Sequence, residues 1–300
     1  MKCRLICITA ALIWMLLGCT STMARESVER RIDVNGLGRS YLVYRPAELG
    51  RQQQVPLVVV LHGGFGSGAQ AEKSYNWDAV ADAEGFVAVY PDGIRHSWNA
   101  GGTCCGKALR NNVDDVGFIS RMIAAVSRAE NIDAKRIYLT GISNGAAMAY
   151  RYACEGSTPV AAFGSVSGDM TMPCPHPHAA SVMEIHGLDD RNIPFEGDYG
   201  SKGVTHIKWP PVMQTIDLFR RAANCTMPEK AARGVVTTST SVCAEGREVI
   251  LTTIAGAGHQ WPGARPQGAL AAALLHLDPP STALDATRTL WHFFKKHESP

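Results

Sequence analysis

A serine between two glycines is the first feature of this sequence that could do chemistry. Gly141-Ile-Ser-Asn-Gly145 follows an apolar run, residues 136–141, that predicts a buried strand, and precedes an Ala-rich segment, residues 146–154, that predicts a helix. Gly-x-Ser-x-Gly between a strand and a helix is the setting that exposes a nucleophilic serine on a sharp turn. The alternative is a glycine-containing turn without chemistry, and the motif alone does not exclude it.

A nucleophilic serine needs a base and a residue that orients the base. Residues 181–187 predict a buried strand that is followed by Asp189 and Asp190, and His259 lies in a glycine-rich loop after the next predicted strand, residues 247–255. Each residue alone would be a turn aspartate or a loop histidine. Their order along the chain, and the position of each just after a strand, favour a catalytic set.

The oxyanion of an acyl-transfer intermediate needs hydrogen-bond donors. One expected donor is the backbone N–H of Asn144, directly after the serine. The other is expected from the glycine-rich segment 61–68, where Gly64 is the preferred residue, Phe65 is its neighbour and His62 is assigned a structural role. A phosphate-binding loop is disfavoured, because the segment lacks the Gly-Lys-Ser/Thr and Gly-x-Gly-x-x-Gly patterns.

Five ordered blocks of the sequence resemble the polyhydroxybutyrate-depolymerase-like esterases, a group that includes the feruloyl and acetylxylan esterases of carbohydrate esterase family 1. The blocks are LHGGFGSGA, SWNAGGTCCG with NNVDDVGFI, GISNGAAM, HGLDDRNIPFEG and GAGHQWPG, and the resemblance spans residues 31–300. It implies an α/β-hydrolase fold, a serine esterase triad and no cofactor.

The resemblance also implies roles for single residues. The block His-Gly-x-x-Asp makes Asp190 the acid of a triad with Ser143 and His259, with Asp189 a neighbour. Trp261 matches a family tryptophan that lines the site. Trp98 is expected to flank an acyl pocket, and a plain core position is the alternative for both tryptophans. Asp115, at a predicted helix start, is interpreted as a cap or loop anchor.

The remaining pattern predicts an α/β fold with a mostly parallel sheet covered by helices on both faces. Strands are expected at residues 39–46, 56–64, 85–93, 136–141, 161–168, 181–187 and 247–255, and helices at 78–85, 113–130, 146–154, 211–223 and 282–296. Long segments without periodicity, residues 93–113, 188–210 and 261–280, follow strand ends and are expected to contact substrate. No large lid is predicted.

The N-terminus predicts export. Two basic residues precede an apolar stretch, residues 5–17, that is too short to span a bilayer comfortably. Residues 1–24 are therefore assigned to a signal peptide and residues 25–300 to one catalytic domain. In a second, favoured interpretation the signal ends at residue 18, because LLGC resembles a lipobox in which Cys19 is lipidated. Periplasm, outer membrane and secretion all remain open.

Six cysteines follow the signal region, and an oxidising compartment favours disulfides. The preferred pairs are Cys154 with Cys174 and Cys225 with Cys243, since each closes a short loop. Cys104 and Cys105 are left as neighbours, and either could pair elsewhere. No cysteine or histidine spacing supports a metal site.

These features favour an exported serine carboxylesterase that cleaves short acyl or hydroxycinnamoyl esters on plant polysaccharide. Polyhydroxyalkanoate depolymerase or oligomer hydrolase is the alternative within the class, and the absence of a binding module or linker speaks against insoluble polyester. Other classes considered are a non-enzymatic ligand-binding lipoprotein and a peptidase. The net charge of +2, without a basic block, favours no nucleic-acid partner. The expected partners are a small ester or a polysaccharide-linked ester, and a membrane only through a lipid anchor.

Overall fold

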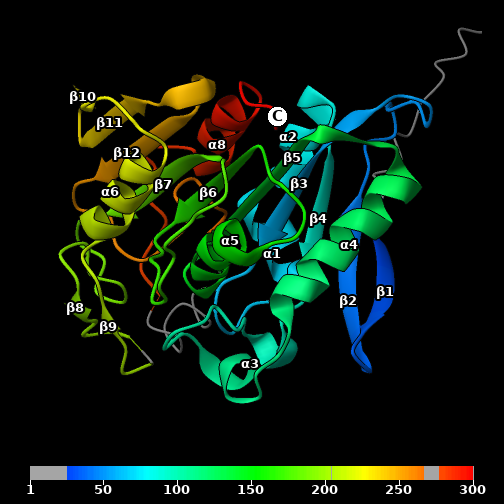
Figure 1. The fold of residues 1–300 in the computed structure, drawn as a ribbon, viewed down its shortest axis with the longest axis horizontal. Coiled ribbons are helices and arrows are strands. Elements are labelled where there is room, and N and C mark those ends of the chain that lie inside the picture. The colour runs from blue at the N-terminus through cyan, green and yellow to red at the C-terminus, as the bar shows by residue number, and fades with distance from the viewer. Residues whose placement is uncertain (1–25, 204, 267–276, 300) are drawn as a thin grey trace, which may run out of the picture.

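The computed structural model describes residues 26–203, 205–266 and 277–299. The predicted signal peptide and Cys19 lie outside the described residues. Within them, no helix is long and apolar enough to cross a bilayer. The described chain forms a large twisted sheet with helices on both faces, which confirms the α/β prediction (Figure 1).

The central sheet of the described residues has ten strands in the order β1-β2-β4-β3-β5-β6-β7-β12-β11-β10. The strands are β1 (Val28–Val34), β2 (Leu37–Tyr44), β3 (Val55–Leu61), β4 (Val87–Pro91), β5 (Ile132–Ile142), β6 (Ala162–Val166), β7 (Ser181–Gly187), β10 (Glu229–Arg233), β11 (Val236–Val242) and β12 (Glu248–Ile254). The middle six, from β4 to β12, run parallel, and the two outer strands at each edge pair antiparallel. Parallel strands aligned in this way bring their carboxyl ends to one edge.

Helices cover the sheet on both sides. They are α1 (Gly68–Tyr75), α2 (Trp77–Glu84), α3 (Gly106–Arg110), α4 (Asp115–Glu130), α5 (Asn144–Glu155), α6 (Val212–Ala222) and α8 (Ala286–Phe294). In Figure 1, α4 and α5 cross the front of the sheet. Along β3, Leu57 and Val59 pack into the core beneath α4 and α5, whereas Val58 and Val60 pack into the core with α1, α2 and α8. The strand is buried on both faces, as its unbroken apolar sequence predicts.

Two hairpins at the sheet edges were not predicted from the sequence. β1 and β2 are joined at Asn35-Gly36, both with positive φ, which is the turn chemistry that two-residue hairpins favour. β10 is exposed along its whole length, and its sequence has no apolar alternation that would predict a strand. The short strands β8 (Asp198–Tyr199) and β9 (Lys208–Trp209) pair separately within a long loop.

Three disulfides join the six described cysteines. Cys154 pairs with Cys174 and Cys225 with Cys243, the pairings that the sequence favoured. Cys104 and Cys105, which the sequence left open, are bonded to each other. None of the six is therefore a free thiol.

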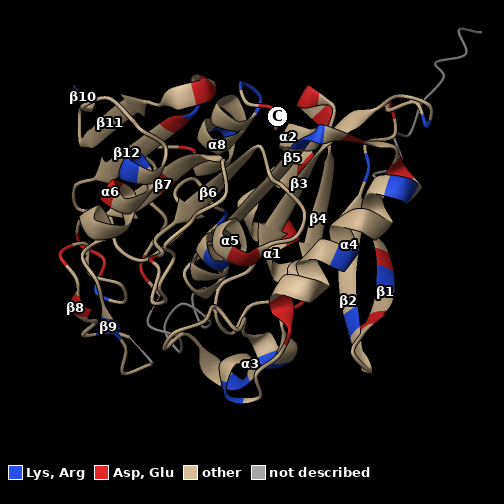
Figure 2. Cartoon of the chain, in the orientation of Figure 1, with Lys and Arg blue, Asp and Glu red and all other residues tan. Residues whose placement is uncertain are grey.

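Figure 2 shows residues of both charge signs interspersed along the outer helices and edge strands, and few charged residues on the central strands. This mixture of signs agrees with the small net charge of the sequence.

Candidate active site

Ser143 occupies a sharp turn between β5 and α5. Its backbone angles are φ 56° and ψ −122°, which are costly for a residue other than glycine, and its N–H donates to the Val166 carbonyl oxygen on β6 at 3.0 Å. A Cβ atom at Gly141 would lie 2.6 Å from the carbonyl carbon of Gly145. Glycine at position 141 therefore permits the close approach of strand and helix that holds this turn.

Asp190 and His259 contact each other at the same edge of the sheet. Asp190 follows β7 and His259 follows β12, and these strands are neighbours. The Asp190 Oδ2 atom lies 2.7 Å from His259 Nδ1, while Asp190 Oδ1 accepts hydrogen bonds from the N–H groups of Asn192 and Ile193. Asp190 is 4% exposed and its neighbour Asp189 is exposed, so Asp190 is the aspartate that faces the histidine.

The environment of Asp190 favours its ionised form. Burial works to raise the pKa of this carboxyl, but His259, His186 and the Ile193 amide outweigh burial and lower the pKa below its usual range. Asp190 is therefore a carboxylate at neutral pH and can accept a hydrogen bond from a protonated Nδ1 of His259.

A second aspartate fixes the backbone of the histidine loop. The His259 N–H donates to Asp278 Oδ2 at 2.9 Å, and Asp278 Oδ1 lies 2.5 Å from Lys202 Nζ. A side chain at Gly258 would collide with the Asp278 carboxylate. Asp278 was missed in the sequence, because a lone aspartate before two prolines carries no local motif.

The glycine-rich loop after β3 lies against the serine turn. A Cβ atom at Gly63 would be 3.5 Å from the Ser143 Cβ. The Phe65 N–H donates to the His96 carbonyl oxygen, and among the described residues nothing accepts a hydrogen bond from the Gly64 N–H. The first N–H groups of a helix have no partner within the helix, and Asn144 is the first residue of α5. Both predicted oxyanion donors therefore lie in segments adjoining Ser143.

His62 supports this loop from below. The Gly93 N–H donates to His62 Nε2 at 2.9 Å, so the ring proton is on Nδ1, which donates to the Gly63 carbonyl oxygen at 2.7 Å. Burial is the main cause that lowers the pKa of His62 to about 4, so the ring is neutral at pH 7. Its structural assignment from sequence agrees with these contacts.

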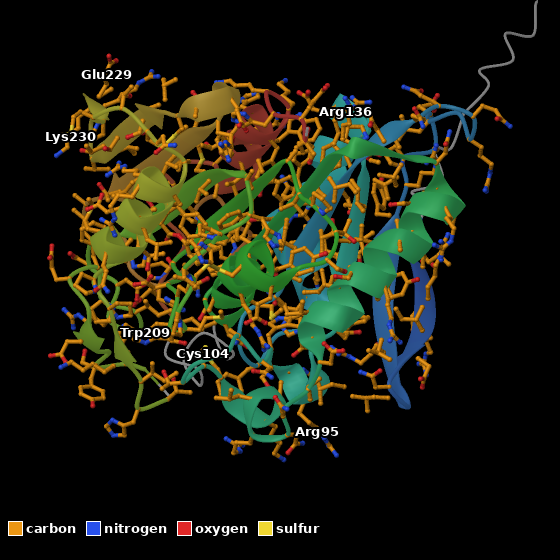
Figure 3. All side chains as sticks on the ribbon, viewed as in Figure 1. Arg95, Cys104, Arg136, Trp209, Glu229 and Lys230 are labelled. Atoms are coloured by element: carbon orange, nitrogen blue, oxygen red, sulfur yellow. A yellow bond between two sulfur atoms is a disulfide. The ribbon has the colours of Figure 1, made fainter. Side chains whose placement is uncertain are left out.

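The side chain of Asn144 clamps the loop that carries Trp98. Asn144 Oδ1 accepts from the Trp98 N–H at 2.7 Å, and Asn144 Nδ2 donates to the Trp98 carbonyl oxygen at 2.9 Å and approaches Cys104 Sγ at 3.5 Å. Cys104 is labelled in Figure 3, where it lies in the lower half of the molecule, above Arg95. The sequence pointed only to the backbone of Asn144, so this side-chain role is new.

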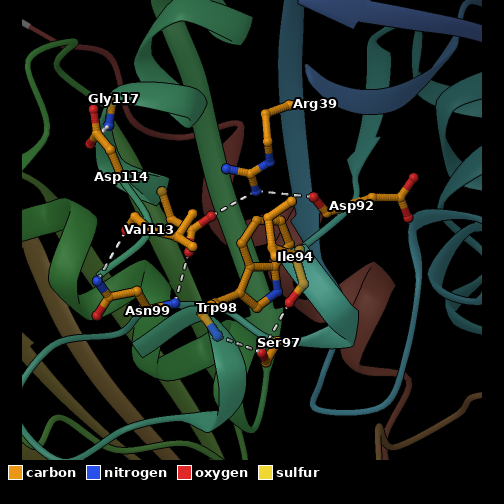
Figure 4. A network of polar contacts seen from close by, with 12 residues as sticks. Arg39, Asp92, Ile94, Ser97, Trp98, Asn99, Val113, Asp114 and Gly117 are labelled. Atoms are coloured by element: carbon orange, nitrogen blue, oxygen red, sulfur yellow. Dashed lines mark hydrogen bonds and ion pairs between the residues drawn. The ribbon is translucent and has the colours of Figure 1, made fainter. Parts of the chain in front are cut away.

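A buried ion pair anchors the same loop from the other side (Figure 4). Arg39 on β2 donates to Asp115 Oδ1 at 2.7 Å and to the Asp92 carbonyl oxygen at 3.1 Å, and its guanidinium lies 3.9 Å from the centre of the Phe118 ring. Asp115 Oδ2 accepts from the Asn99 N–H at 2.8 Å. Asp115 is thus the loop anchor that the sequence suggested, and Asp114 is the helix cap.

Both tryptophans expected to contact substrate are completely buried. The Trp98 ring lies 4.9 Å from the His62 ring, and its Nε1 donates to the His62 carbonyl oxygen. Trp261 stacks on Tyr75 and donates to Thr287. The prediction that Trp98 and Trp261 line the substrate site is wrong for this structure, because neither ring presents surface.

Phe65 is different, because its side chain is 68% exposed beside Gly64. Its backbone φ of 66° is unusual for an aromatic residue, and the adjoining Arg95 and His96 also have positive φ. The exposed ring thus lies beside the loop that is predicted to hold the oxyanion, and its contact with a substrate stays a prediction.

A comparison of the sequence with models of known families gives one match. The sequence model described as Esterase PHB depolymerase matches residues 39–195, more than half of the chain. The chain belongs to this family. The Esterase PHB depolymerase members include enzymes of the α/β-hydrolase type that act on ester bonds, and this protein is an esterase of that type.

Several relatives are similar over different lengths. NocK of Nocardia uniformis subsp. tsuyamanensis, named as a presumed esterase, is 31% identical over 264 residues, which cover 81% of this chain and 75% of NocK. The bifunctional acetylxylan esterase/xylanase XynS20E of Neocallimastix patriciarum is 31% identical over 54% of this chain but only 23% of its own length. Poly(3-hydroxyalkanoate) depolymerase C of Paucimonas lemoignei is 29% identical over 40% of this chain and 30% of its own length.

Solved structures share the fold of this Esterase PHB depolymerase member. An acetyl xylan esterase from Aspergillus awamori superposes with a TM-score of 0.60 at 15% identity, covering 77% of this chain and 94% of that one. Esterase 2 of Thermogutta terrifontis gives a TM-score of 0.55 at 15% identity, covering 90% and 94%. At these identities the likeness concerns the fold alone.

Among the described residues, no group of three His, Cys, Asp or Glu side chains could hold a metal ion.

Proposed function

We propose that this protein is an exported serine esterase that uses Ser143, His259 and Asp190 as a catalytic triad. The observation that carries the proposal is the 2.7 Å contact between His259 Nδ1 and the buried carboxylate of Asp190, at the sheet edge where the Ser143 turn also lies. A fixed Nδ1 proton leaves His259 Nε2 free to accept a proton.

In this mechanism Ser143 Oγ attacks the ester carbonyl carbon while His259 takes the hydroxyl proton. The tetrahedral oxyanion accepts hydrogen bonds from the Asn144 and Gly64 backbone amides. Collapse of the intermediate expels the alcohol, which receives its proton from His259. Water then attacks the acyl-enzyme by the same route, and Asp190 stabilises the charged imidazole in both steps.

The proposed substrates are short acyl or hydroxycinnamoyl esters, including those attached to plant polysaccharide. The relative XynS20E is named an acetylxylan esterase, which supports this class. The exposed Phe65 ring beside Gly64 offers a flat apolar surface, and such a surface suits a small acyl group or an aromatic ring better than a flexible chain. A hydroxyalkanoate oligomer is the alternative, since depolymerase C is also a relative. Three disulfides support export.

The nucleophile is tested by Ser143→Ala and by a fluorophosphonate probe. We expect the variant to lose roughly 10⁴-fold or more in kcat/KM, and mass spectrometry to find the probe on Ser143. Ser157→Ala, an exposed serine after α5, is the matched control and keeps full activity. Labelling at another serine would refute the triad.

The substrate class is tested on a panel of acetyl, feruloyl, hydroxybutyrate-oligomer and long-chain esters. We expect kcat/KM to be highest for acetyl or feruloyl esters and much lower for acyl chains above about eight carbons, since each methylene-scale mismatch costs about 1–3 kcal/mol. A hydroxybutyrate oligomer as best substrate would favour the alternative. A long-chain ester as best substrate would contradict both, even if Ser143 is labelled.

A further inference from the structure

Two ionisable side chains lie behind the proposed triad and have no part in the mechanism above. Glu184 and His186 are two residues apart on β7, so they point to the same face of the sheet. Both are completely buried, and Glu184 Oε1 lies 2.9 Å from His186 Nδ1. The Tyr150 hydroxyl donates to Glu184 Oε2 at 3.0 Å. A glutamate is almost never fully buried unless it is paired, and Glu184 has both His186 and Tyr150 as partners.

The hydrogen bonds of His186 determine where its protons lie. His186 Nε2 is 2.9 Å from the carbonyl oxygen of Ile193, which can only accept, so Nε2 carries a proton. On the opposite side, Nδ1 faces a carboxylate oxygen of Glu184. A carboxylate can only accept, so an ionised Glu184 requires a proton on Nδ1 as well. The geometry thus accommodates a doubly protonated, positively charged ring.

His186 is also connected to Asp190 by two routes. The first is the backbone of Ile193, whose carbonyl accepts from His186 and whose N–H donates to Asp190 Oδ1 at 2.9 Å. The second is direct, because His186 Nε2 lies 3.7 Å from Asp190 Oδ2, the oxygen that contacts His259. The His186 ring therefore fixes the turn that holds Asp190. A protonated ring also places positive charge beside Asp190 Oδ2.

The surrounding charges favour this state. Burial works to lower the pKa of His186, but Glu184, Asp190 and the Ile193 carbonyl outweigh it and raise the pKa to about 9. Burial also raises the pKa of Glu184, and the contact with His186 opposes that rise, so it is the 2.9 Å contact between the two groups that favours the ionised pair. Asp169, from the segment after β6, also lies near the ring, but burial raises its pKa to about 7, so it supplies little negative charge below that pH. The titratable groups that surround His186 in the described residues are Glu184 on β7, Tyr150 on α5, Asp169 after β6, Asp190 after β7 and, through Asp190, His259 after β12.

We propose that His186, held as an imidazolium by Glu184, is a positioning residue that fixes the Asp190 turn and partly neutralises the negative charge of Asp190. The proposed triad then extends to the series Glu184–His186–Asp190–His259–Ser143. This inference rests on the proposed function. It assigns to His186 an electrostatic effect on His259, exerted through Asp190, that a purely structural core histidine would not have.

The inference predicts how His186→Gln behaves. The amide can still donate to the Ile193 carbonyl, but the positive charge beside Asp190 is lost. His259 then faces a more negative environment and holds its proton more tightly, so the acidic limb of the kcat/KM profile moves to higher pH. We expect kcat to fall roughly 10–100-fold, because a small displacement of a supporting group can cost that much, while KM stays within about twofold. His176→Gln, an exposed histidine, is the control.

The charge of His186 is measured directly on the unmodified protein. With ¹⁵N-labelled histidine, NMR at pH 7 is expected to show both nitrogens of His186 protonated, whereas His62 carries one proton. Assignment uses the His186→Gln spectrum or, where that variant does not fold, the Glu184→Gln spectrum. A neutral His186 ring in the unmodified protein overturns the inference.

Two further outcomes are decisive. An acidic limb that moves to higher pH in His186→Gln but not in His176→Gln supports the inference. A folded His186→Gln protein whose limb stays in place overturns it. Labelling of Ser143 by the fluorophosphonate tests the proposed function separately. Labelled Ser143 with a neutral His186 ring would leave the proposed function standing and overturn this inference. A charged His186 ring with no labelling of Ser143 would contradict the proposed function alone.

Discussion

Asp189 and Asp190 are adjacent in sequence but differ in burial and in their contacts. Asp190 is buried and contacts His259, whereas Asp189 is exposed. We expect Asp190→Asn to lower kcat roughly 10⁴-fold, because the amide favours the wrong tautomer of His259. Asp189→Asn, the matched control, should change kcat little. Steady-state kinetics measures kcat for both variants. A larger loss of kcat in Asp189→Asn than in Asp190→Asn would contradict the assignment of Asp190 as the acid.

Asn144 combines a proposed backbone role with a structural side-chain role. Its Oδ1 is the acceptor for the buried Trp98 N–H. Asn144→Leu keeps the size of the side chain but leaves that N–H unpaired, which should cost about 1–3 kcal/mol of unfolding free energy. Activity should fall as well, because the loop beside Ser143 is released. Urea unfolding and kcat/KM measure the two effects, with exposed Asn111→Ala as control. Unchanged stability would show that the clamp contributes nothing.

At this scale the sequence anticipated some contacts and missed others. Asp190 and His259 were expected to lie together because each follows a strand and because their order after Ser143 is a known one, and the structure brings the two into contact. The catalytic role of all three residues stays a prediction. Trp98 and Trp261 were misplaced, since an aromatic residue near a motif can equally belong to the core, and here both rings do. Asp278, His186 and the Asn144 side chain act through contacts between segments distant in sequence, which no local pattern reveals.

Among the elements, β2 and α4 are joined by the buried Arg39–Asp115 pair, which also holds the Asn99 backbone. Removing one partner leaves an uncompensated buried charge, so Asp115→Asn or Arg39→Met should each lower the free energy of unfolding by about 3–5 kcal/mol. The double variant Arg39→Met/Asp115→Asn, which combines the same two substitutions, should recover part of that loss. Chemical denaturation of the single and double variants gives the coupling free energy.

The exposed pair Glu29–Arg31 is the control for that cycle, since surface ion pairs contribute little. Its variants should change the free energy of unfolding only slightly. If the losses from the two buried single variants simply add in the double variant, the pair is not coupled and the loop is held by its hydrogen bonds alone.

The elements themselves were predictable where periodicity was strong. α4 was expected at residues 113–130 and is found at Asp115–Glu130, and β12 was expected at 247–255 and is found at Glu248–Ile254. The start of α4 lies two residues later than expected because a cap such as Asp114 does not show in the apolar pattern, and each end of β12 lies one residue inside the expected range. α1, β10 and β11 escaped prediction because short or solvent-facing elements have little apolar contrast.

For the molecule as a whole, stability should depend on pH through the buried acids near the site. Asp169 is 1% exposed, and its Oδ1 accepts hydrogen bonds from the Thr215 hydroxyl and the Met170 N–H. In the part of the chain that the structure describes, its Oδ2 has no partner. Burial is the main cause that raises the pKa of Asp169 from 3.8 to about 7, and Glu184 adds to the effect.

The sign of the effect follows from proton binding. Between pH 3.8 and about 7 the unfolded chain has released the Asp169 proton while the folded protein still holds it. The folded state therefore binds more protons, and stability from this group falls as pH rises through that window, by about 4 kcal/mol in all. Asn cannot titrate, so the free energy of unfolding of Asp169→Asn, relative to the unmodified protein, should rise from pH 4 to pH 7 and then level off. Urea denaturation at half-unit pH intervals measures this difference, and two curves that stay parallel would show that Asp169 is already ionised in the folded molecule.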